Sequence, residues 1–214
     1  MRLRDLITFL CLPTVLAAGA CRTDTNSSRY ATELLRHYEQ IWGRSSEVSQ
    51  WTRGPVHELP PSFRVAVFPP RAGRSYWVYA TLGMSLGYDE SMELHLFSPQ
   101  QASELIELLT VVAHYHRTGS KVGLHHTVDF GRPWLPNSTC NYGLISLPYL
   151  NGPDLEWLIT PDFKIRSLWL LPITEAERDF KKRQGAEALE QLFEEHQVDY
   201  LNPERESLVV GEGS

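Results

Sequence analysis

The sequence predicts an α+β protein in which helices pack on a mixed, mainly antiparallel sheet. Short runs rich in β-branched and aromatic residues are separated by turn residues, which is the pattern of antiparallel strands. Segments with apolar residues at helical spacing stand before, between and after these runs. Hydrophobic residues make up 42% and charged residues 21% of the 214 positions, as in an ordinary globular chain with one main domain.

The first helix is expected over residues 29–42, with Ser28 as its N-cap and Gly43 as its stop. Five strands are expected to share one sheet, at residues 63–68, 76–84, 92–97, 144–148 and 165–171. The first three follow one another closely enough to form an antiparallel meander. Residues 155–159 are interpreted as a further short strand or a turn of helix.

A second helix is expected after Ser98, because Ser98 and Gln101 have the capping-box spacing with a proline at the first helical position. Its apolar stripe runs to about His116, and Thr118-Gly119 ends it.

Another capping box, at Thr174 and Glu177, opens a third long helix that reaches Gln184. Gly185 interrupts the pattern, and a last helix is expected over residues 186–196.

Residues 1–21 have the layout of an export signal: basic residues, an apolar run and then small residues before Cys21. This end resembles a bacterial lipoprotein cleavage site, so we expect export and lipid on Cys21 as a membrane attachment. Residues 22–29 would be a polar tether, and residues 30–210 the folded domain. The alternative is a cytoplasmic protein in which residues 1–21 are an unprocessed extension.

The negative charge is concentrated in the last forty residues. Residues 175–214 hold eleven acidic and five basic residues, which accounts for the net charge of −6 of the whole chain. Because nucleic-acid binding depends on Lys and Arg that neutralise phosphates, no nucleic-acid partner is expected. A basic protein partner suits this end of the chain better.

The stretch 114–140 offers the residues from which a catalytic site could be built. It contains four histidines, at positions 114, 116, 125 and 126, together with Cys140. One hypothesis is therefore a metal-assisted or thiol hydrolase that uses this stretch. His114 and His116 would point to different faces of a helix, and no established zinc, nucleophile or phosphate-binding motif accompanies them. We therefore expect a protein without catalytic residues, metal or other cofactor.

Several blocks in a fixed order resemble the bacterial branch of the suppressor-of-fused domain family. They are FRVAVFPP (63–70), YATLGMS (79–85), ELIELLTVVAHYH (104–116), GLHHTVDFGRPWLPNST (123–139), GLISLPYL (143–150), LLPITEAE (170–177) and GAEALEQLF (185–193). The resemblance covers about residues 30–210. It implies a non-catalytic protein-binding domain. In animal members this domain is half of a two-domain clamp, and the chain has no room for the second half.

The bacterial members resemble immunity proteins, so the implied partner is a cognate toxin or a short extended peptide segment of it. We place the partner-binding surface between the second helix and the strand 144–148. Glycines and prolines prevent regular structure there, and recognition residues collect on such loops. The candidate contact residues are His126, Asp129, Trp134 and Asn137. The alternative for Trp134 is a structural role over the core.

Overall fold

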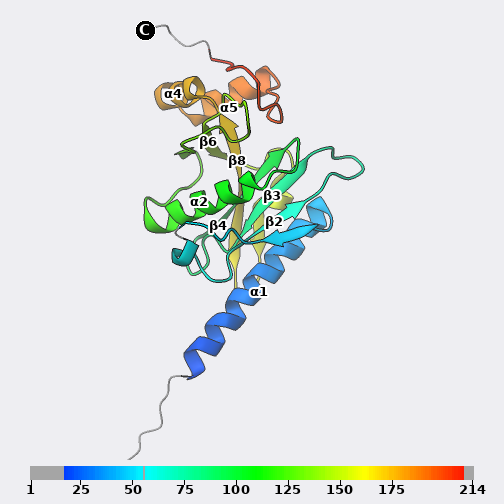
Figure 1. Cartoon of the computed structure of the whole chain (residues 1–214), viewed down its shortest axis with the longest axis vertical. Coiled ribbons are helices and arrows are strands. Elements are labelled where there is room, and N and C mark those ends of the chain that lie inside the picture. The colour runs from blue at the N-terminus through cyan, green and yellow to red at the C-terminus, as the bar shows by residue number, and fades with distance from the viewer. Residues whose placement is uncertain (1–16, 55, 210–214) are drawn as a thin grey trace, which may run out of the picture.

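The computed structural model describes residues 17–54 and 56–209, and it is organised around one eight-stranded sheet (Figure 1). The strands are β1 (Glu47–Ser49), β2 (Arg64–Phe68), β3 (Trp77–Leu82), β4 (Ser91–Ser98), β5 (Thr127–Asp129), β6 (Tyr142–Ser146), β7 (Trp157–Ile159) and β8 (Lys164–Ile173). Their order across the sheet is β1-β2-β3-β4-β8-β6-β5, and β7 pairs with β8. Only the β4–β8 pairing is parallel. The predicted fold class is therefore confirmed.

All five predicted strands are present, as β2, β3, β4, β6 and β8. Residues 155–159 contain both of the alternatives considered, because α3 (Pro153–Glu156) leads directly into β7. The sequence did not predict β1 and β5, which are three residues long and lie at the two ends of the strand order. Such short strands have too few positions for alternation to be recognised.

Helices cover both faces of the sheet, and the sheet separates the core into two hydrophobic clusters, one on each face. They are α1 (Ala17–Trp42), the 3₁₀ turn η1 (Val56–Glu58), α2 (Glu104–Thr118), α3, α4 (Glu175–Gln184) and α5 (Ala186–Glu195). The apolar stripe of α2 packs on one face, whereas α1 and α5 pack on the other. In Figure 1, α1 and the α4–α5 pair lie at opposite ends of the molecule.

Helix α1 packs through a stripe of Tyr30, Leu34, Tyr38 and Trp42, all buried and spaced by four residues. It ends as predicted, because the N–H of Gly43 donates to Glu39 O (3.0 Å).

The predicted beginning of α1 is wrong. Ser28 lies inside the helix, where its carbonyl accepts from Thr32 Oγ1 (2.8 Å), and residues 22–29 continue the helix. The segment expected to be a polar tether is thus helical in the structure.

The expected capping box at Ser98 is also wrong, since α2 begins only at Glu104. The hydroxyl of Ser98 instead bonds to the backbone of Gln100, accepting from its N–H and donating to its carbonyl. The segment that follows is held by the sheet, because the Ala102 N–H donates to Tyr79 Oη (2.7 Å). The helix ends at Thr118 with Gly119 after it, as predicted.

The capping box at Thr174 is confirmed: Thr174 Oγ1 accepts from the Glu177 N–H, and the Glu177 carboxylate accepts from the Thr174 N–H. Glu177 is fully buried and also receives two hydrogen bonds from Arg205, at 2.6 and 2.7 Å. This bidentate pair fastens the C-terminal segment to α4.

Most of the predicted signal lies outside the described residues. Residues 1–16 are not described, and Cys21 falls in the part of α1 whose side chains are not described. Among the residues that are described, no helix has an apolar stretch long enough to cross a bilayer.

Candidate partner-binding site

The stretch expected to be an irregular loop contains the edge strand β5. His126 directly precedes this strand and Asp129 ends it, so two of the four predicted contact residues lie at one edge of the sheet. Both are exposed, and so is Asn137, which adopts a positive φ of 65° in the turn beyond. In the part of the chain that the structure describes, no hydrogen bond joins any two of these three side chains. They are therefore not joined into a hydrogen-bonded cluster.

Strand β5 pairs with β6 and stands last in the strand order. Asp129 is held at its end, because its Oδ1 accepts from the Gly131 N–H (2.8 Å). The backbone of an edge strand presents unpaired N–H and C=O groups to which an extended peptide can add.

Trp134 belongs to the core and not to the surface. Its side chain is 2% exposed and packs in the cluster beneath α2. This burial favours the structural role of Trp134 over the core, which was the alternative to its role as a contact residue. The other three candidate contact residues, His126, Asp129 and Asn137, are exposed.

The four histidines of the stretch 114–140 do not converge. His114 pairs with Glu58, and His116 is buried against Ser85. His125 Nε2 lies 3.6 Å from Glu190 Oε2, and His126 is exposed. Over residues 17–54 and 56–209, no three His, Cys, Asp or Glu side chains are grouped closely enough to hold a metal ion.

Cys140 is placed for packing. It is 1% exposed within the hydrophobic core, and burial raises the pKa of its thiol. A reactive cysteine needs the opposite, a lowered pKa and access from solvent. The geometry of these residues thus provides no activated nucleophile for the hydrolase hypothesis.

His116 attaches the segment after α2 to the body of the domain. Its Nδ1 accepts from the Val122 N–H (3.1 Å), so its Nε2 carries the hydrogen and donates to Ser85 Oγ (3.1 Å). The Ser85 hydroxyl in turn donates to Met92 O (2.7 Å). Burial lowers the pKa of His116 to about 4, which keeps this ring neutral at pH 7.

A buried carboxylate holds the turn that carries Ser85. Glu93 accepts hydrogen bonds from Tyr30 Oη, Thr81 Oγ1 and the backbone N–H groups of Gly83, Met84 and Ser85. Burial raises its pKa, while the bonded donors favour the charged form. The alternation of strand 92–97 marks Glu93 as a polar position, but it does not reveal that the side chain is buried.

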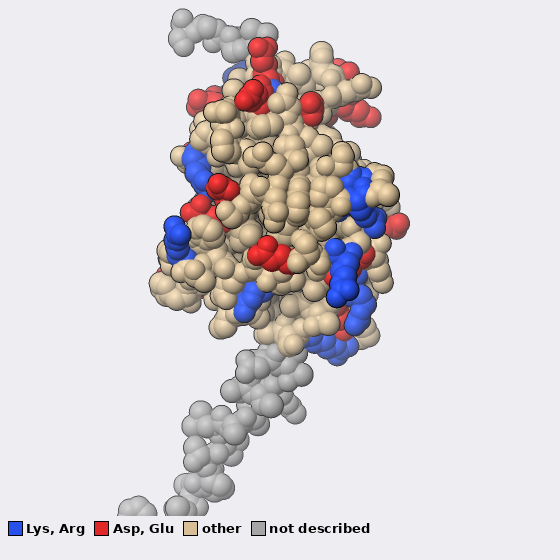
Figure 2. Space-filling view, turned by 45° about the vertical axis from the view of Figure 1, so that its right-hand side comes forward, with Lys and Arg blue, Asp and Glu red and all other residues tan. Residues whose placement is uncertain are grey.

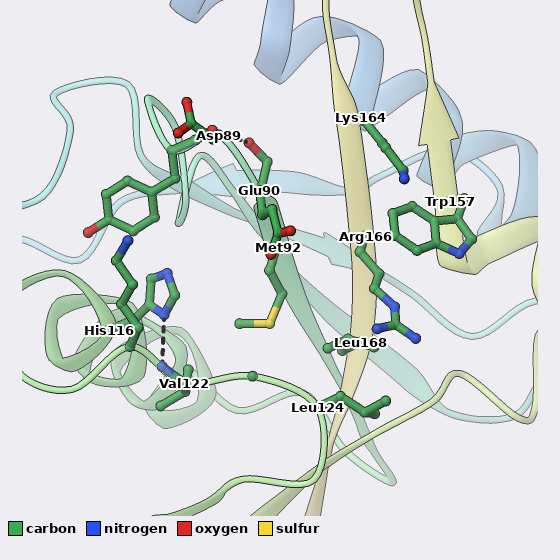
Figure 3. Close-up of a pocket in the computed structure, with 14 residues that line it drawn as sticks. Asp89, Glu90, Met92, His116, Val122, Leu124, Trp157, Lys164, Arg166 and Leu168 are labelled. Atoms are coloured by element: carbon green, nitrogen blue, oxygen red, sulfur yellow. Dashed lines mark hydrogen bonds between the residues drawn. The ribbon is translucent and has the colours of Figure 1, made fainter.

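A groove of about 700 Å³ opens beside this network (Figure 3). In Figure 3, Met92 lies between His116 on one side and Arg166 on the other, and Trp157 forms the far wall. Three separate segments of the chain line the groove: residues 88–92, 116–124, and 157–168 with its β7–β8 hairpin. Its wall at residues 121–124 leads directly to His125, His126 and the edge strand β5.

Each wall of this groove has an aromatic ring beside a cation, and the acidic residues Asp89 and Glu90 also line it. Lys164 Nζ and the Arg166 guanidinium lie 4.7 and 5.2 Å from the ring of Trp157, which is 37% exposed. On the opposite wall, Lys121 Nζ lies 4.3 Å from the ring of Tyr88. These contacts hold the rings in place at the surface. An acidic or apolar side chain of a partner would find both a charge and a flat ring there.

The sequence analysis missed this groove because its walls are distant along the chain. The sequence allows either a short strand or a turn of helix over residues 155–159, just after a proline. No local pattern there indicates that Trp157 lies across the groove from Tyr88. The pairing of β4 with β8 and of β7 with β8 brings residues 88–92 next to residues 157–168.

A sequence profile described as "Suppressor of fused protein (SUFU)" matches residues 60–206. A solved structure of a putative suppressor of fused homolog from Neisseria gonorrhoeae is 34% identical, with a TM-score of 0.75. The match covers 86% of this chain and 98% of that one. No significant match was found among curated protein sequences.

Two further structures share the fold at low identity. A Sufu-Fu complex matches with a TM-score of 0.64 and 14% identity, over 84% of this chain and 92% of that chain. Suppressor of Fused from Drosophila matches with a TM-score of 0.59 and 15% identity. This second match covers 84% of this chain but 51% of the Drosophila chain.

Proposed function

The chain belongs to the suppressor of fused family, and from this premise we propose that it is a non-catalytic protein-binding domain that binds and neutralises a cognate toxin as an immunity protein. The partner docks on the groove between Tyr88 and Trp157 and on the adjoining edge strand β5. One observation carries the proposal: a groove with aromatic rings on both walls is lined by residues 121–124, which precede the edge strand β5 along the chain. Anchoring rings beside an edge strand suit an extended segment of a partner.

Two further features support a protein as the ligand. One structure with the same fold is a complex of Sufu with Fu, so that protein binds another protein. The wall of the groove contains exposed Trp157 and half-exposed Arg166, and Trp and Arg are over-represented among residues that dominate binding energy. The immunity role rests on the resemblance to bacterial members described above.

The first prediction concerns the contributions of Trp157 and Asp129 to binding of the proposed cognate toxin, which we expect to be encoded beside this gene. Trp157→Ala should weaken binding of that toxin about 30-fold, because truncating an anchoring ring costs about 2 kcal/mol. Asp129→Ala should weaken it by a smaller factor, since a rim charge contributes less than an anchor. Titration calorimetry with purified proteins measures both, and growth rescue on co-expression measures neutralisation.

Val111→Ala is the control, because Val111 is an exposed apolar residue on α2 that does not line the groove. It should leave affinity unchanged. Equal affinities for the wild type and the Trp157 and Asp129 variants would refute this docking surface. A toxin that is neutralised without any binding would refute the function itself.

We also propose that Cys21 carries lipid, which would put the partner outside the cytoplasm. The prediction is that the chain fractionates with membranes and incorporates an alkyne-labelled fatty acid, whereas Cys21→Ser does neither. Stable anchoring requires more than one acyl chain, as in a lipoprotein. A wild-type chain that stays in the cytoplasm with Met1 intact would contradict this prediction.

A further inference from the structure

A second groove, of about 810 Å³, lies between α5 and the end of the sheet. Its floor is apolar and aromatic, formed by Leu171, Phe193, Val198 and the rings of Trp169 and Tyr200. Tyr149 and Leu150, which are 57% and 44% exposed, stand at its edge. An exposed apolar surface rimmed by polar groups marks an interaction site on a soluble protein.

The rim of this second groove carries negative charge only. Glu187, Glu190 and Glu194 line it from successive turns of α5, and none of its lining residues is Lys or Arg. Within the described part of the chain, neither Glu187 nor Glu194 has a cationic partner within salt-bridge distance. In Figure 2, acidic side chains gather at the same end of the molecule, over α4 and α5. A cationic side chain of a partner can therefore pair with the carboxylates of Glu187 and Glu194.

Glu190 is fixed more firmly than its neighbours. Its Oε1 accepts from Ser146 Oγ and its Oε2 from Tyr149 Oη (3.2 Å). Burial and the nearby glutamates raise the pKa of Tyr149 to about 12, so its hydroxyl remains a donor at neutral pH. The rim thus has one ordered carboxylate flanked by two free ones.

The floor contains a polar group without a partner. Trp169 is 5% exposed, and its indole N–H has no hydrogen-bond acceptor among the described residues. The ring of Tyr200 packs edge-on against it, with the ring centroids 5.2 Å apart. A buried donor without an acceptor is costly, and a carbonyl of a bound segment that reached it would relieve that cost.

We propose that this second groove binds a basic extended segment of a partner protein, with a Lys or Arg side chain between Glu187 and Glu194 and an apolar side chain over Phe193 and Val198. The acidic rim requires a positively charged segment, and the apolar floor requires hydrophobic residues beside the cation. A backbone carbonyl of the segment accepts from Trp169. This surface is separate from the groove at Trp157, and the inference does not depend on the toxin-neutralising role.

The test uses a capped heptapeptide of glycine, leucine, lysine, leucine, lysine, leucine and glycine, titrated into the ¹⁵N-labelled full chain. The indole resonance of Trp169, assigned by its loss in Trp169→Phe, should shift during the titration. The double variant Glu187→Gln/Glu194→Gln should bind about tenfold more weakly, which corresponds to about 0.7 kcal/mol for each lost ion pair. Added salt should weaken binding to the wild type more than to this variant.

Two controls make the result decisive. A peptide with glutamate in place of lysine should not bind. The variant Glu195→Gln/Glu204→Gln removes the same charge from exposed residues outside this groove, and it should bind like the wild type. The proposal is overturned if the lysine peptide fails to bind, if both double variants bind equally well, or if the resonances that move surround Trp157 instead of Trp169.

Discussion

Acidification from pH 7 to pH 4.5 is expected to lower the free energy of unfolding by about 5 kcal/mol, because two buried histidines gain protons only when the chain unfolds. His95 is fully buried between the rings of Trp42 and Phe97, and burial lowers its pKa to about 3. His116 is 4% exposed, and its pKa is lowered to about 4. Neither ring nitrogen of His95 has a hydrogen-bond partner among the described residues.

The sign of this pH effect follows from how the two histidines are protonated in the unfolded and in the folded chain. In the unfolded chain both histidines titrate near pH 6.5, so below that pH the unfolded state binds more protons than the folded state. The contribution of these two histidines to the free energy of unfolding is fully present above pH 6.5. It falls as the pH drops toward their pKa values in the folded state. At pH 4.5 each histidine contributes a loss of about 2.7 kcal/mol, from about 1.36 kcal/mol per unit. A domain of ordinary stability would be near its unfolding threshold there.

His95→Leu isolates half of this effect. An apolar side chain of similar size removes two unsatisfied ring nitrogens, so stability at pH 7 should stay equal or rise by about 1 kcal/mol. The loss between pH 7 and pH 4.5 should shrink by about half, as measured by urea denaturation followed by circular dichroism. The exposed His57 provides the control, and His57→Leu should leave the pH dependence unchanged. An unaltered pH profile in His95→Leu would show that His95 does not carry the effect.

Trp134→Ala should lower the free energy of unfolding by about 3–5 kcal/mol without altering the intrinsic affinity for the partner. The indole fills a space in the core beneath α2, and its removal leaves a cavity. Trp134→Phe keeps most of the ring and removes only an indole N–H that has no acceptor in the described structure, so its cost should be below about 2 kcal/mol.

Denaturation curves and calorimetry on the same samples distinguish the two roles of Trp134. Binding is measured at a temperature where the variant remains folded, so that a loss of folded protein is not mistaken for a loss of affinity. A 30-fold fall in affinity with unchanged stability would restore Trp134 as an anchor. The opposite pattern would leave Tyr88 and Trp157, on the two walls of the groove, as the aromatic residues of the site.

Periodicity and capping chemistry located the main elements because these signals are local. The five long strands, the end of α1 at Gly43 and the capping box of Thr174 and Glu177 each depend on residues within a few positions of one another. Ser98 shows the limit of that reasoning. It has the spacing of a capping box, but a bond from the Ala102 N–H to Tyr79 on a distant strand holds the segment outside the helix.

For the candidate site, the sequence singled out the segment 114–140, because glycines, prolines and polar residues concentrate there, and it predicted His126, Asp129 and Asn137 as contacts; the structure shows that these three residues are exposed. The composition of the sequence also showed that the negative charge is concentrated at the C-terminal end of the chain. It could not decide between an anchor and a core role for Trp134, since a tryptophan has the same local neighbours in either case. The burial of Trp134 is decided by the packing of the core cluster beneath α2. The placement of Tyr88 and Trp157 across one groove depends on the parallel pairing of β4 with β8, which joins residues more than seventy positions apart.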